Sequence, residues 1–272
     1  MRAGTRALIT GASSGIGEEF ARQLAARGWP LVLVARSEDR LSAVRASITA
    51  NDPQLDVRVI ALDLSEPGAP AELFARLQRE NAPISLLVNN AGFGAFGDFG
   101  VIDAARQRRM IDLNIAALVE LSHLFLAQAE SARQAKAPRP AIINVASVAG
   151  FVPLPYSAVY AATKAFVVSF SLALAEEARP KSVQVLAVNP GSTQTNFFEV
   201  AGKTPFSHPA RMQTSAQVVR EALRAFDRGK SMVTTGVPNR AMVLLSRALP
   251  KGLVTRAVGA AMRKSGVHRQ GG

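Results

Sequence analysis

A short apolar run followed by closely spaced glycines constrains the fold of this chain more than any other feature. Residues 7–9 are apolar, Thr10 and Gly11 follow, and Gly15 and Gly17 precede a periodic helical pattern. A strand, a tight turn and a helix in this order let a pyrophosphate approach the backbone and meet the free N–H groups of the helix N-terminus. The spacing T-G-x-x-x-G-x-G therefore predicts a phosphate-binding turn at the start of the chain.

Short apolar segments alternate with helical patterns along the rest of the sequence. Strands are predicted at residues 6–10, 30–35, 56–62, 85–89, 140–146, 183–189 and 231–234. The runs 31–34 and 142–145 are almost continuously apolar, as strands buried on both faces are. The alternation predicts an α/β fold in which helices cover both faces of a parallel sheet.

A second group of residues predicts chemistry at a carbonyl. Tyr160 and Lys164 are four residues apart in a segment, 157–179, that is predicted to be helical, so their side chains share one face. An ammonium group one turn away is expected to lower the pKa of the Tyr160 phenol from its ordinary value of about 10. Such a phenol can protonate a carbonyl oxygen or deprotonate an alcohol, and the Ser147 hydroxyl can hold the same oxygen.

With further motifs in a fixed order, the chain resembles the short-chain dehydrogenase/reductase family. The shared motifs are Thr10-Gly11-Ala12-Ser13-Ser14-Gly15-Ile16-Gly17, Asp63-Leu64, Asn89-Asn90-Ala91-Gly92, Asn114, Ser147, Tyr160-x-x-x-Lys164 and Pro190-Gly191. The resemblance implies a Rossmann-like, doubly wound three-layer sandwich with about seven parallel strands. It also implies nicotinamide-dependent oxidation or reduction, and a homodimer or homotetramer formed through helices that include 157–179.

The same resemblance implies a set of cofactor-binding residues. They are Gly11, Ser13, Ser14, Gly15, Ile16 and Gly17 in the Gly-rich turn, then Asp63, Leu64, Asn89, Ala91, Gly92, Tyr160, Lys164, Pro190, Gly191, Thr193 and Thr195. Asp63 has the family's position for bonding the adenine, and it can also cap the turn that follows it. Asn89 and Ala91 are expected to border the adenosine ribose, and Thr193 to bond the nicotinamide carboxamide.

The implied catalytic residues are Asn114, Ser147, Tyr160 and Lys164. NADPH delivers a hydride to the carbonyl carbon, Tyr160 protonates the oxygen and Ser147 orients it. Lys164 lowers the pKa of the tyrosine and bonds the nicotinamide ribose. Asn114 has the place of the family's relay residue, which holds a water between the lysine and solvent. The alternative for Asn114 is a polar residue that kinks its helix.

The residue after the second strand predicts the choice of cofactor. NAD-selective sites place an acid there to bind the ribose 2′-hydroxyl, whereas this chain has Arg36 and no acid before Glu38. A cation at this turn suits a 2′-phosphate, so NADP(H) is favoured over NAD(H). The alternative is a solvated surface arginine, and Arg40, one helical turn further on, is expected to be a surface charge.

Composition excludes several other classes of protein. The chain has no cysteine, which excludes disulfides and thiolate metal sites. Its histidines, His123, His208 and His268, show no ligand spacing, so no metal site is predicted. No apolar run reaches the roughly 18 residues of a membrane span, and the first residues lead directly into a strand rather than a secretory signal. We therefore expect a cytoplasmic protein.

The walls of the substrate pocket are expected to be apolar. They should come from the residues after Ser147, from 93–99 and from 194–212. The apolar candidates are Phe151, Val152, Leu154, Phe197, Phe198 and Phe206. No cation is clearly placed to bind a substrate carboxylate, since Arg211 is expected at the surface. An apolar ketone or aldehyde is therefore favoured. The segment 197–209 is interpreted as a mobile lid, or alternatively as an ordered surface loop.

Positive charge is concentrated at the C-terminal end of the chain. The net charge is +12, and no acidic residue follows Asp227. Nine basic residues do follow it: Arg228, Lys230, Arg240, Arg247, Lys251, Arg256, Arg263, Lys264 and Arg269. We expect a single domain over residues 1–236 and a basic helical extension over 237–272, either packed on the domain or projecting from it. The extension is expected to break at Pro250 into two helical pieces.

Each piece of this extension has an apolar face opposite its arginines. In the first piece this face is formed by Met242, Leu245 and Leu249. In the second piece it is formed by Val254, Val258 and Ala261. These faces can pack on the domain or on a second subunit and leave the charges in solvent. They can also bind the anionic inner face of a membrane. An acidic partner, such as an acyl carrier, is the third possibility, and nucleic acid is the least favoured because no known binding module accompanies the charge.

Two classes of function fit these observations. The first is a reductase, or a dehydrogenase in the reverse direction, that acts on an apolar carbonyl compound. The second is a protein that binds NADP(H) as a sensor or structural partner without turnover. Loss of Tyr160 or Lys164 would favour the second class, and both are present. An isomerase, dehydratase or epimerase on the same fold stays open.

Overall fold

The computed structural model describes residues 6–131, 139–202, 204 and 212–267. Its strands are β1 (Arg6–Thr10), β2 (Leu31–Ala35), β3 (Val57–Ala61), β4 (Ile84–Asn89), β5 (Ala141–Val145), β6 (Gln184–Asn189), β7 (Thr193–Gln194), β8 (Gln213–Thr214) and β9 (Met232–Thr234). All seven predicted strands are present. Several residues named above lie outside the described ranges: Phe206, His208, Arg211, His268, Arg269 and part of the segment 197–209.

Helices occupy the segments between these strands. They are α1 (Gly15–Ala25), α2 (Glu38–Thr49), α3 (Ala69–Arg79), α4 (Ala104–Ile111), α5 (Leu118–Ser131), α6 (Ala158–Ala178), α7 (Phe197–Ala201), α8 (Ser215–Asp227), α9 (Val237–Ala248) and α10 (Lys251–Lys264). A π-helical segment, η1 (Asp112–Ala117), joins α4 to α5, and a 3₁₀ turn, η2 (Val148–Phe151), follows β5. The predicted helix 157–179 is thus confirmed as α6.

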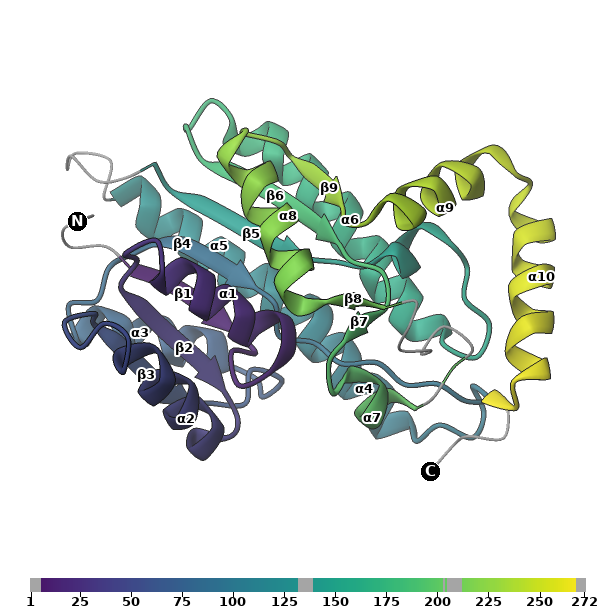
Figure 1. Cartoon of the computed structure of the whole chain (residues 1–272), viewed down its shortest axis with the longest axis horizontal. Coiled ribbons are helices and arrows are strands. Elements are labelled where there is room, and N and C mark those ends of the chain that lie inside the picture. Colours follow the sequence, from purple (N-terminus) through teal and green to yellow (C-terminus); the bar gives the residue numbers. More distant parts are fainter. Residues whose placement is uncertain (1–5, 132–138, 203, 205–211, 268–272) are drawn as a thin grey trace.

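The main sheet has the order β3-β2-β1-β4-β5-β6-β9, and every pair in it is parallel (Figure 1). This is the doubly wound arrangement that the sequence predicts. The strand order reverses at β1, where β2 leaves on one side and β4 lies on the other. Open parallel sheets bind ligands beside the carboxyl ends of their strands at such a point.

Alternate residues of each strand point to opposite faces of the sheet. On β1, Ile9 packs with the helices α1, α2 and α8, whereas Leu8 packs with α3 and α5. On β2, Leu33 lies on the same face as Ile9, and Val32 lies on the same face as Leu8. Both faces are therefore covered, which explains why β2 is apolar at every position and β1 at its three central positions.

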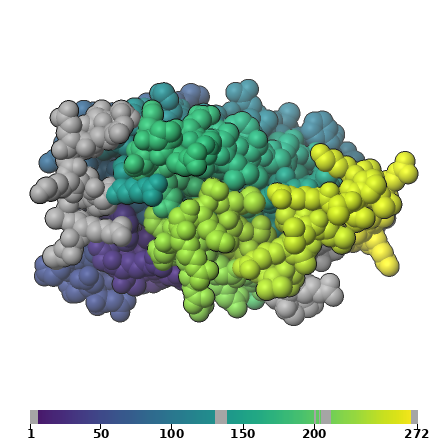
Figure 2. Space-filling view, turned by 90° about the horizontal axis from the view of Figure 1, so that it is seen from above, coloured from purple at the N-terminus to yellow at the C-terminus, as the bar shows by residue number. Residues whose placement is uncertain are grey.

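The C-terminal extension lies at the opposite end of the molecule from α2 and α3 (Figure 1), and Figure 2 shows it over one end of the surface. Its two helices are separated at Leu249 and Pro250, where the break was expected. In α10, Val258 and Met262 pack against the domain. The apolar face expected on α9 does not pack on the domain.

On α9 the buried side chain is Val243, whereas Met242, Leu245 and Leu249 are exposed. The helix turns Asn239, Val243 and Ser246 inward, one and two turns apart, so the predicted stripe falls on the outer side. On α10, Ala261 is also exposed because Gly259 and Met262 face the domain instead.

Two described helical stretches are long and apolar enough to cross a membrane, Ala104–Ala129 and Ala158–Ala178. The expectation that no such segment exists is therefore wrong by length and composition. Both helices flank the parallel sheet, and 39% of each apolar window is buried inside the protein. Core helices of this kind pass the same test as membrane spans, so the two stretches are weak evidence of insertion.

Candidate active site

The Gly-rich turn is closely packed against the end of β4. A Cβ atom on Gly17 would lie 2.2 Å from the Gly11 carbonyl oxygen, and one on Gly11 would lie 2.9 Å from the Ala91 Cα. Gly11 and Gly15 also have φ values of 64° and 59°, in the left-handed region that favours glycine. The turn is thus a concave surface lined by main chain at the start of α1, and these residues fit a pyrophosphate.

Thr10 and Asn90 hold this turn in place. The Thr10 hydroxyl accepts hydrogen bonds from the main-chain N–H groups of Asn90 and Ala91, at 3.0 and 2.9 Å. The Asn90 side chain donates to the carbonyl oxygens of Thr10 and Gly11, at 2.9 and 3.2 Å. The carboxyl ends of β1 and β4 are therefore tied together directly beneath the proposed phosphate site.

Thr195 lies over the Gly-rich turn from the opposite side. A Cβ on Gly15 would lie 2.8 Å from its Cγ2. Together they border a polar cleft of about 440 Å³. The cleft is lined by Ser13, Ser14, Gly15, Glu18, Glu19, Arg40, Gln194, Thr195, Asn196 and Ser215. Arg40 is exposed, as expected, and it also lines this cleft beside the Gly-rich turn.

Arg36 and Asp63 meet at the ends of β2 and β3. The Arg36 Nη1 atom lies 3.9 Å from an Asp63 carboxylate oxygen, and the arginine side chain is 79% exposed. Asp63 also accepts hydrogen bonds from the main chain and hydroxyl of Ser65, at 2.9 and 2.7 Å, so it caps the following turn. An exposed guanidinium with one long ion pair can turn toward an incoming anion.

The side chains of Asn89 and Leu64 point into the protein. Asn89 donates to Ser122 at 3.1 Å and to Asn144 at 2.9 Å, and it is 3% exposed. Leu64 packs in the core on the face covered by α3 and α5. Any contact of these two residues with a cofactor therefore has to come from their main chain, because their side chains are turned away from the edge of the sheet.

Ser147, Tyr160 and Lys164 converge at the carboxyl end of β5. The Lys164 Nζ donates to the Val145 carbonyl at 2.8 Å and lies 5.9 Å from the centre of the Tyr160 ring. The Ser147 hydroxyl lies close enough to the Tyr160 phenol to lower its pKa. Ser147 begins η2 as its N-cap and accepts from the Ala149 N–H at 3.1 Å, which orients the hydroxyl.

The pKa of Tyr160 differs from the expectation. Burial raises the pKa of this phenol to about 12, and the hydrogen bond with Ser147 lowers it. The prediction that Lys164 brings it below its ordinary value is therefore wrong for this structure, because desolvation of the phenolate dominates. Burial also lowers the pKa of the Lys164 ammonium, to about 8. At neutral pH the tyrosine is thus a phenol beside a mostly protonated lysine.

Asn114 lies in the π-helical segment η1, which the sequence did not predict. Its amide accepts from the Phe93 N–H at 3.1 Å and donates to the Phe93 carbonyl and to Thr163 at 3.0 and 3.1 Å. A Cβ on Gly92 would lie 2.8 Å from the Asn114 Oδ1 and 3.5 Å from the Lys164 Nζ. Asn114 and Lys164 therefore flank Gly92, where π-helical turns often position functional groups.

The Pro190-Gly191 turn connects Ser147 with the strand β7. The Pro190 carbonyl accepts from the Val148 N–H at 3.0 Å, and the Ser147 hydroxyl lies 3.5 Å from it. The Thr193 hydroxyl donates to the Gly191 carbonyl at 3.0 Å. The predicted nicotinamide-binding residues thus adjoin the predicted catalytic ones at the same edge of the sheet.

Aromatic side chains cover the other side of Tyr160. The Phe197 ring lies 5.4 Å from the Tyr160 ring and meets Phe198 edge-on at 5.3 Å. Phe198 stacks on Phe96 at 6.3 Å, and Met262 of α10 packs with both. Of the predicted pocket residues, Leu154, Phe197 and Phe198 therefore gather here.

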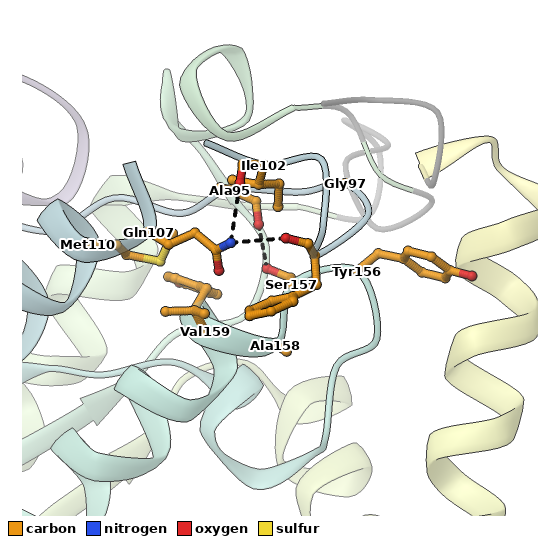
Figure 3. A pocket seen from close by; sticks show the side chains of 11 residues that line it. Ala95, Gly97, Ile102, Gln107, Met110, Tyr156, Ser157, Ala158 and Val159 are labelled. Atoms are coloured by element: carbon orange, nitrogen blue, oxygen red, sulfur yellow. Dashed lines mark hydrogen bonds between the residues drawn. The ribbon is translucent and has the colours of Figure 1, made fainter. Parts of the chain in front are cut away.

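A small apolar cavity of about 20 Å³ adjoins Tyr160. Figure 3 shows Met110 and Val159 on one side of it, with Ser157 donating to the Ala95 carbonyl at 2.9 Å. Tyr156 has a φ of 65°, which is unusual for a bulky residue, and its side chain extends toward α10. Tyr156 and Met262 could not be found from the sequence, since neither belongs to a motif.

Comparisons with known proteins agree with this geometry. Residues 5–205 match the sequence model of a family described as short chain dehydrogenase. The very-long-chain 3-oxoacyl-CoA reductase of Kluyveromyces lactis is 32% identical over 184 residues, which are 67% of this chain and 53% of that protein. This chain therefore spans about half the length of that relative.

Two solved structures resemble the whole fold. A short-chain dehydrogenase from Sphingobium yanoikuyae in complex with NADPH superposes with a TM-score of 0.76 at 36% identity, over 92% of this chain and 94% of that chain. The bulky-bulky ketone specific alcohol dehydrogenase from Comamonas testosteroni superposes with a TM-score of 0.74 at 32% identity, over 93% and 94% of the two chains.

Proposed function

Because this chain belongs to the short-chain dehydrogenase family, we propose that it reduces apolar ketones or aldehydes with NADPH, and oxidises the corresponding alcohols in reverse. The convergence of Ser147, Tyr160 and Lys164 beside a phosphate-binding turn carries this proposal. A proton donor and a cofactor cradle at one sheet edge are what carbonyl reduction requires.

The proton chemistry follows from the protonation states. A bound reduced nicotinamide supplies a hydride for the carbonyl carbon. Tyr160 donates its proton to the carbonyl oxygen, and its high pKa keeps that proton available at neutral pH. The Ser147 hydroxyl bonds the same oxygen, and the Lys164 ammonium stabilises the phenolate that is left. Asn114 is proposed to hold a water that returns a proton toward Lys164.

The cofactor preference is proposed from the cations beside the phosphate site. Arg36 is exposed at the end of β2, and Arg40 lines the cleft beside the Gly-rich turn. Two guanidinium groups at this edge suit the 2′-phosphate of NADP(H). The NADPH complex of the Sphingobium yanoikuyae relative supports the same choice.

An apolar substrate is proposed from the aromatic side chains around Tyr160. Phe197, Phe198 and Phe96 offer stacked and edge-on rings, and Met262 extends the apolar surface. The named relatives, one acting on very-long-chain 3-oxoacyl-CoA and one specific for bulky-bulky ketones, support a large apolar carbonyl compound.

Loss of NADPH absorbance with a panel of apolar and polar ketones and aldehydes tests this function. Tyr160→Phe removes the proton donor and should lower kcat by about a thousandfold while NADPH still binds. The control Tyr156→Phe removes the hydroxyl of the other tyrosine, which extends toward α10 (Figure 3), and should keep most of the turnover. Tight NADPH binding without turnover on any carbonyl compound would favour the sensor function instead.

We also propose that the extension 237–272 touches an anionic membrane surface at the inner face of the cell membrane. On α9 and the start of α10, Val237, Leu244, Leu245 and Leu253 are 73%, 67%, 59% and 59% exposed. The extension carries basic residues and no acidic residue of its own, which suits anionic lipid. Flotation with anionic and neutral vesicles tests this proposal, and Leu244→Ser with Leu245→Ser should abolish any anionic-vesicle binding.

A homodimer or homotetramer is proposed through α6. Phe166 and Leu172 on this helix are 37% and 36% exposed, and Phe166 stacks on Phe170 at 5.7 Å. Exposed apolar side chains on a long helix suit a contact with a second subunit. Sedimentation of the wild type and of Phe166→Glu tests it, since the added charge should dissociate the assembly.

A further inference from the structure

The first turn of α9 presses against the loop that follows β6. A Cβ atom on Gly191 would lie 2.4 Å from both the Nδ2 and the Oδ1 of Asn239. The φ of Gly191 is not positive, so its backbone conformation suits any residue. A side chain on Gly191 would therefore collide with Asn239 of the C-terminal extension, which occupies the space.

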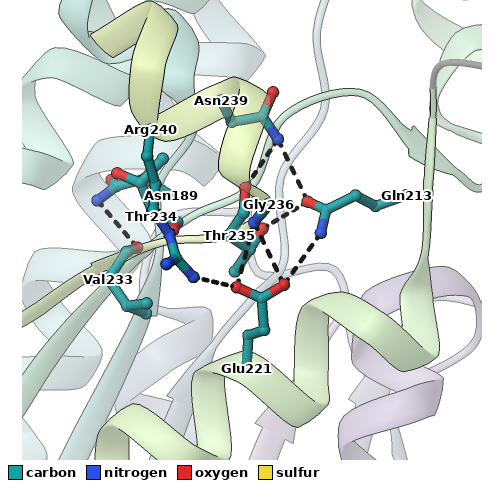
Figure 4. Close-up of polar contacts among 9 residues, drawn as sticks. All are labelled: Asn189, Gln213, Glu221, Val233, Thr234, Thr235, Gly236, Asn239 and Arg240. Carbon is teal, nitrogen blue, oxygen red and sulfur yellow. Dashed lines mark hydrogen bonds and ion pairs between the residues drawn. The ribbon is translucent and has the colours of Figure 1, made fainter. Parts of the chain in front are cut away.

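Asn239 is held by an anchored helix start. Its Nδ2 donates to the Thr235 carbonyl at 2.8 Å (Figure 4). The neighbouring Arg240 donates to a Glu221 carboxylate oxygen at 2.6 Å and to the Thr234 carbonyl at 2.9 Å. Glu221, on α8, also accepts from the Gly236 N–H at 3.1 and 3.3 Å. The start of α9 is thus fastened to α8 and to the end of β9.

The same anchor reaches the strand that bears Thr193. The Gln213 N–H donates to the Ser192 carbonyl at 3.0 Å, and β8 pairs with β7 beside it. The Gln213 side-chain amide lies 2.8 Å from the Thr235 hydroxyl, next to Asn239. Loop 191–193 is therefore supported on one side by β8 and on the other by Asn239.

We propose that Asn239 is a positioning residue that holds the loop 191–193 in the shape that receives the nicotinamide, with the Arg240–Glu221 pair as its anchor. The inference rests on the proposed function, because that function assigns this loop to the nicotinamide. Binding to a preformed loop avoids the entropy cost of ordering it, and small displacements at a reacting centre reduce the rate strongly. A segment outside the family match, which ends at residue 205, thus completes the cofactor site.

Asn239→Ala tests the proposal, with Asn51→Ala as the matched control. Asn51 is exposed just after α2, and in the described contacts its side chain donates only to the Ser47 carbonyl of that helix. Fluorescence titration should show NADPH bound about tenfold more weakly by Asn239→Ala, with kcat lowered and the ketone KM within about twofold. Asn51→Ala should match the wild type in all three quantities. Unchanged NADPH affinity and kcat in folded Asn239→Ala overturn the inference.

A double-mutant cycle with Gly191→Ala sharpens the test. The added methyl should weaken NADPH binding about tenfold in the wild type and much less in the Asn239→Ala background, where the colliding side chain is gone. If the two substitutions weaken NADPH binding by factors that simply multiply in the double variant, the inference is overturned.

If Asn239→Ala does not fold, Glu221→Gln takes its place. It keeps an acceptor for the Gly236 N–H and loses the ion pair, so NADPH binding should weaken about threefold. Unchanged binding in this variant overturns the inference. A wild type that binds neither NADPH nor NADH overturns the proposed function and this inference together, whereas normal wild-type binding with unaffected variants overturns the inference alone.

Discussion

The two edges of the active site are constructed differently. The cofactor edge is formed by main chain at very short range, as between Gly17 and the Gly11 carbonyl. The substrate edge is formed by side chains from distant segments, where Phe197 faces Tyr160 and Met262 packs with Phe197 and Phe198. A pyrophosphate is the same in every dinucleotide and demands one backbone shape, whereas an apolar substrate can be enclosed by many combinations of side chains.

This difference predicts how each edge responds to substitution. At the cofactor edge a methyl group added to Gly11 or Gly17 has no space, because it meets backbone atoms together with the Asn90 side chain. At the substrate edge, aromatic rings and a methionine can repack, so single changes should alter substrate preference more than they alter stability. Four measurements, ordered by expected effect, test this comparison.

Gly17→Ala should have the largest effect. Its Cβ would lie 2.2 Å from a carbonyl oxygen, so the turn must open, and the affinity for NADPH should fall by about a hundredfold. The control Gly252→Ala adds a methyl on α10 where nothing lies within 4 Å. Titration of NADPH fluorescence compares the two. Equal affinities would show that the cofactor edge is not as tightly constrained as proposed.

Arg36→Asp should reverse the cofactor preference. Loss of a charge-assisted hydrogen bond to the 2′-phosphate, and repulsion by the new carboxylate, should lower kcat/KM for NADPH by about thirtyfold while NADH is less affected. The control is Arg45→Asp, the same substitution at an exposed position of the following helix, α2. An unchanged ratio of kcat/KM for NADPH and NADH would refute the assignment of Arg36.

The pH dependence of reduction should report Lys164 and not Tyr160. Burial lowers the pKa of Lys164 to about 8, so the ammonium is lost as the pH rises through this value. Burial raises the pKa of Tyr160 to about 12, so the phenol keeps its proton throughout. The value of kcat/KM should be constant below pH 7 and fall about tenfold per pH unit above 8. A profile that stays flat to pH 10 would contradict this role of Lys164.

Phe197→Ala should have the smallest effect and should separate the two edges. Removing the ring that faces Tyr160 takes away apolar contact with the substrate, so the KM for an apolar ketone should rise about fivefold. The NADPH dissociation constant should stay within about twofold, since the cofactor edge is untouched. Comparable losses in both quantities would mean that the two edges are not independent.

Much of the molecule could be predicted because its signals are local. The seven strands are short apolar runs between turns, and Tyr160 with Lys164 needs only the helical period. The π-helical turn at Asn114 and the two-stranded β7–β8 sheet could not be predicted, because neither has a periodic pattern. The pKa of Tyr160 was also mispredicted, since sequence spacing reveals the nearby lysine but not the burial that outweighs it.

The C-terminal extension shows the same limit. Its charge and its break at Pro250 are visible in the sequence, but which side of α9 faces the protein is not. The face formed by Met242, Leu245 and Leu249 is visible in the sequence. Its exposure, with Val243 turned toward the protein one helical turn from Asn239, is a feature of the tertiary structure.

The sequence by itself determined the α/β class, the Gly-rich turn and the Ser147, Tyr160 and Lys164 trio, because backbone conformation and helical spacing are encoded within a few residues. Only the tertiary structure decided how deeply Tyr160 is buried, which rings cover it, and that Asn239 reaches Gly191. Those features depend on contacts between segments far apart in the chain, and no local pattern specifies where such segments meet.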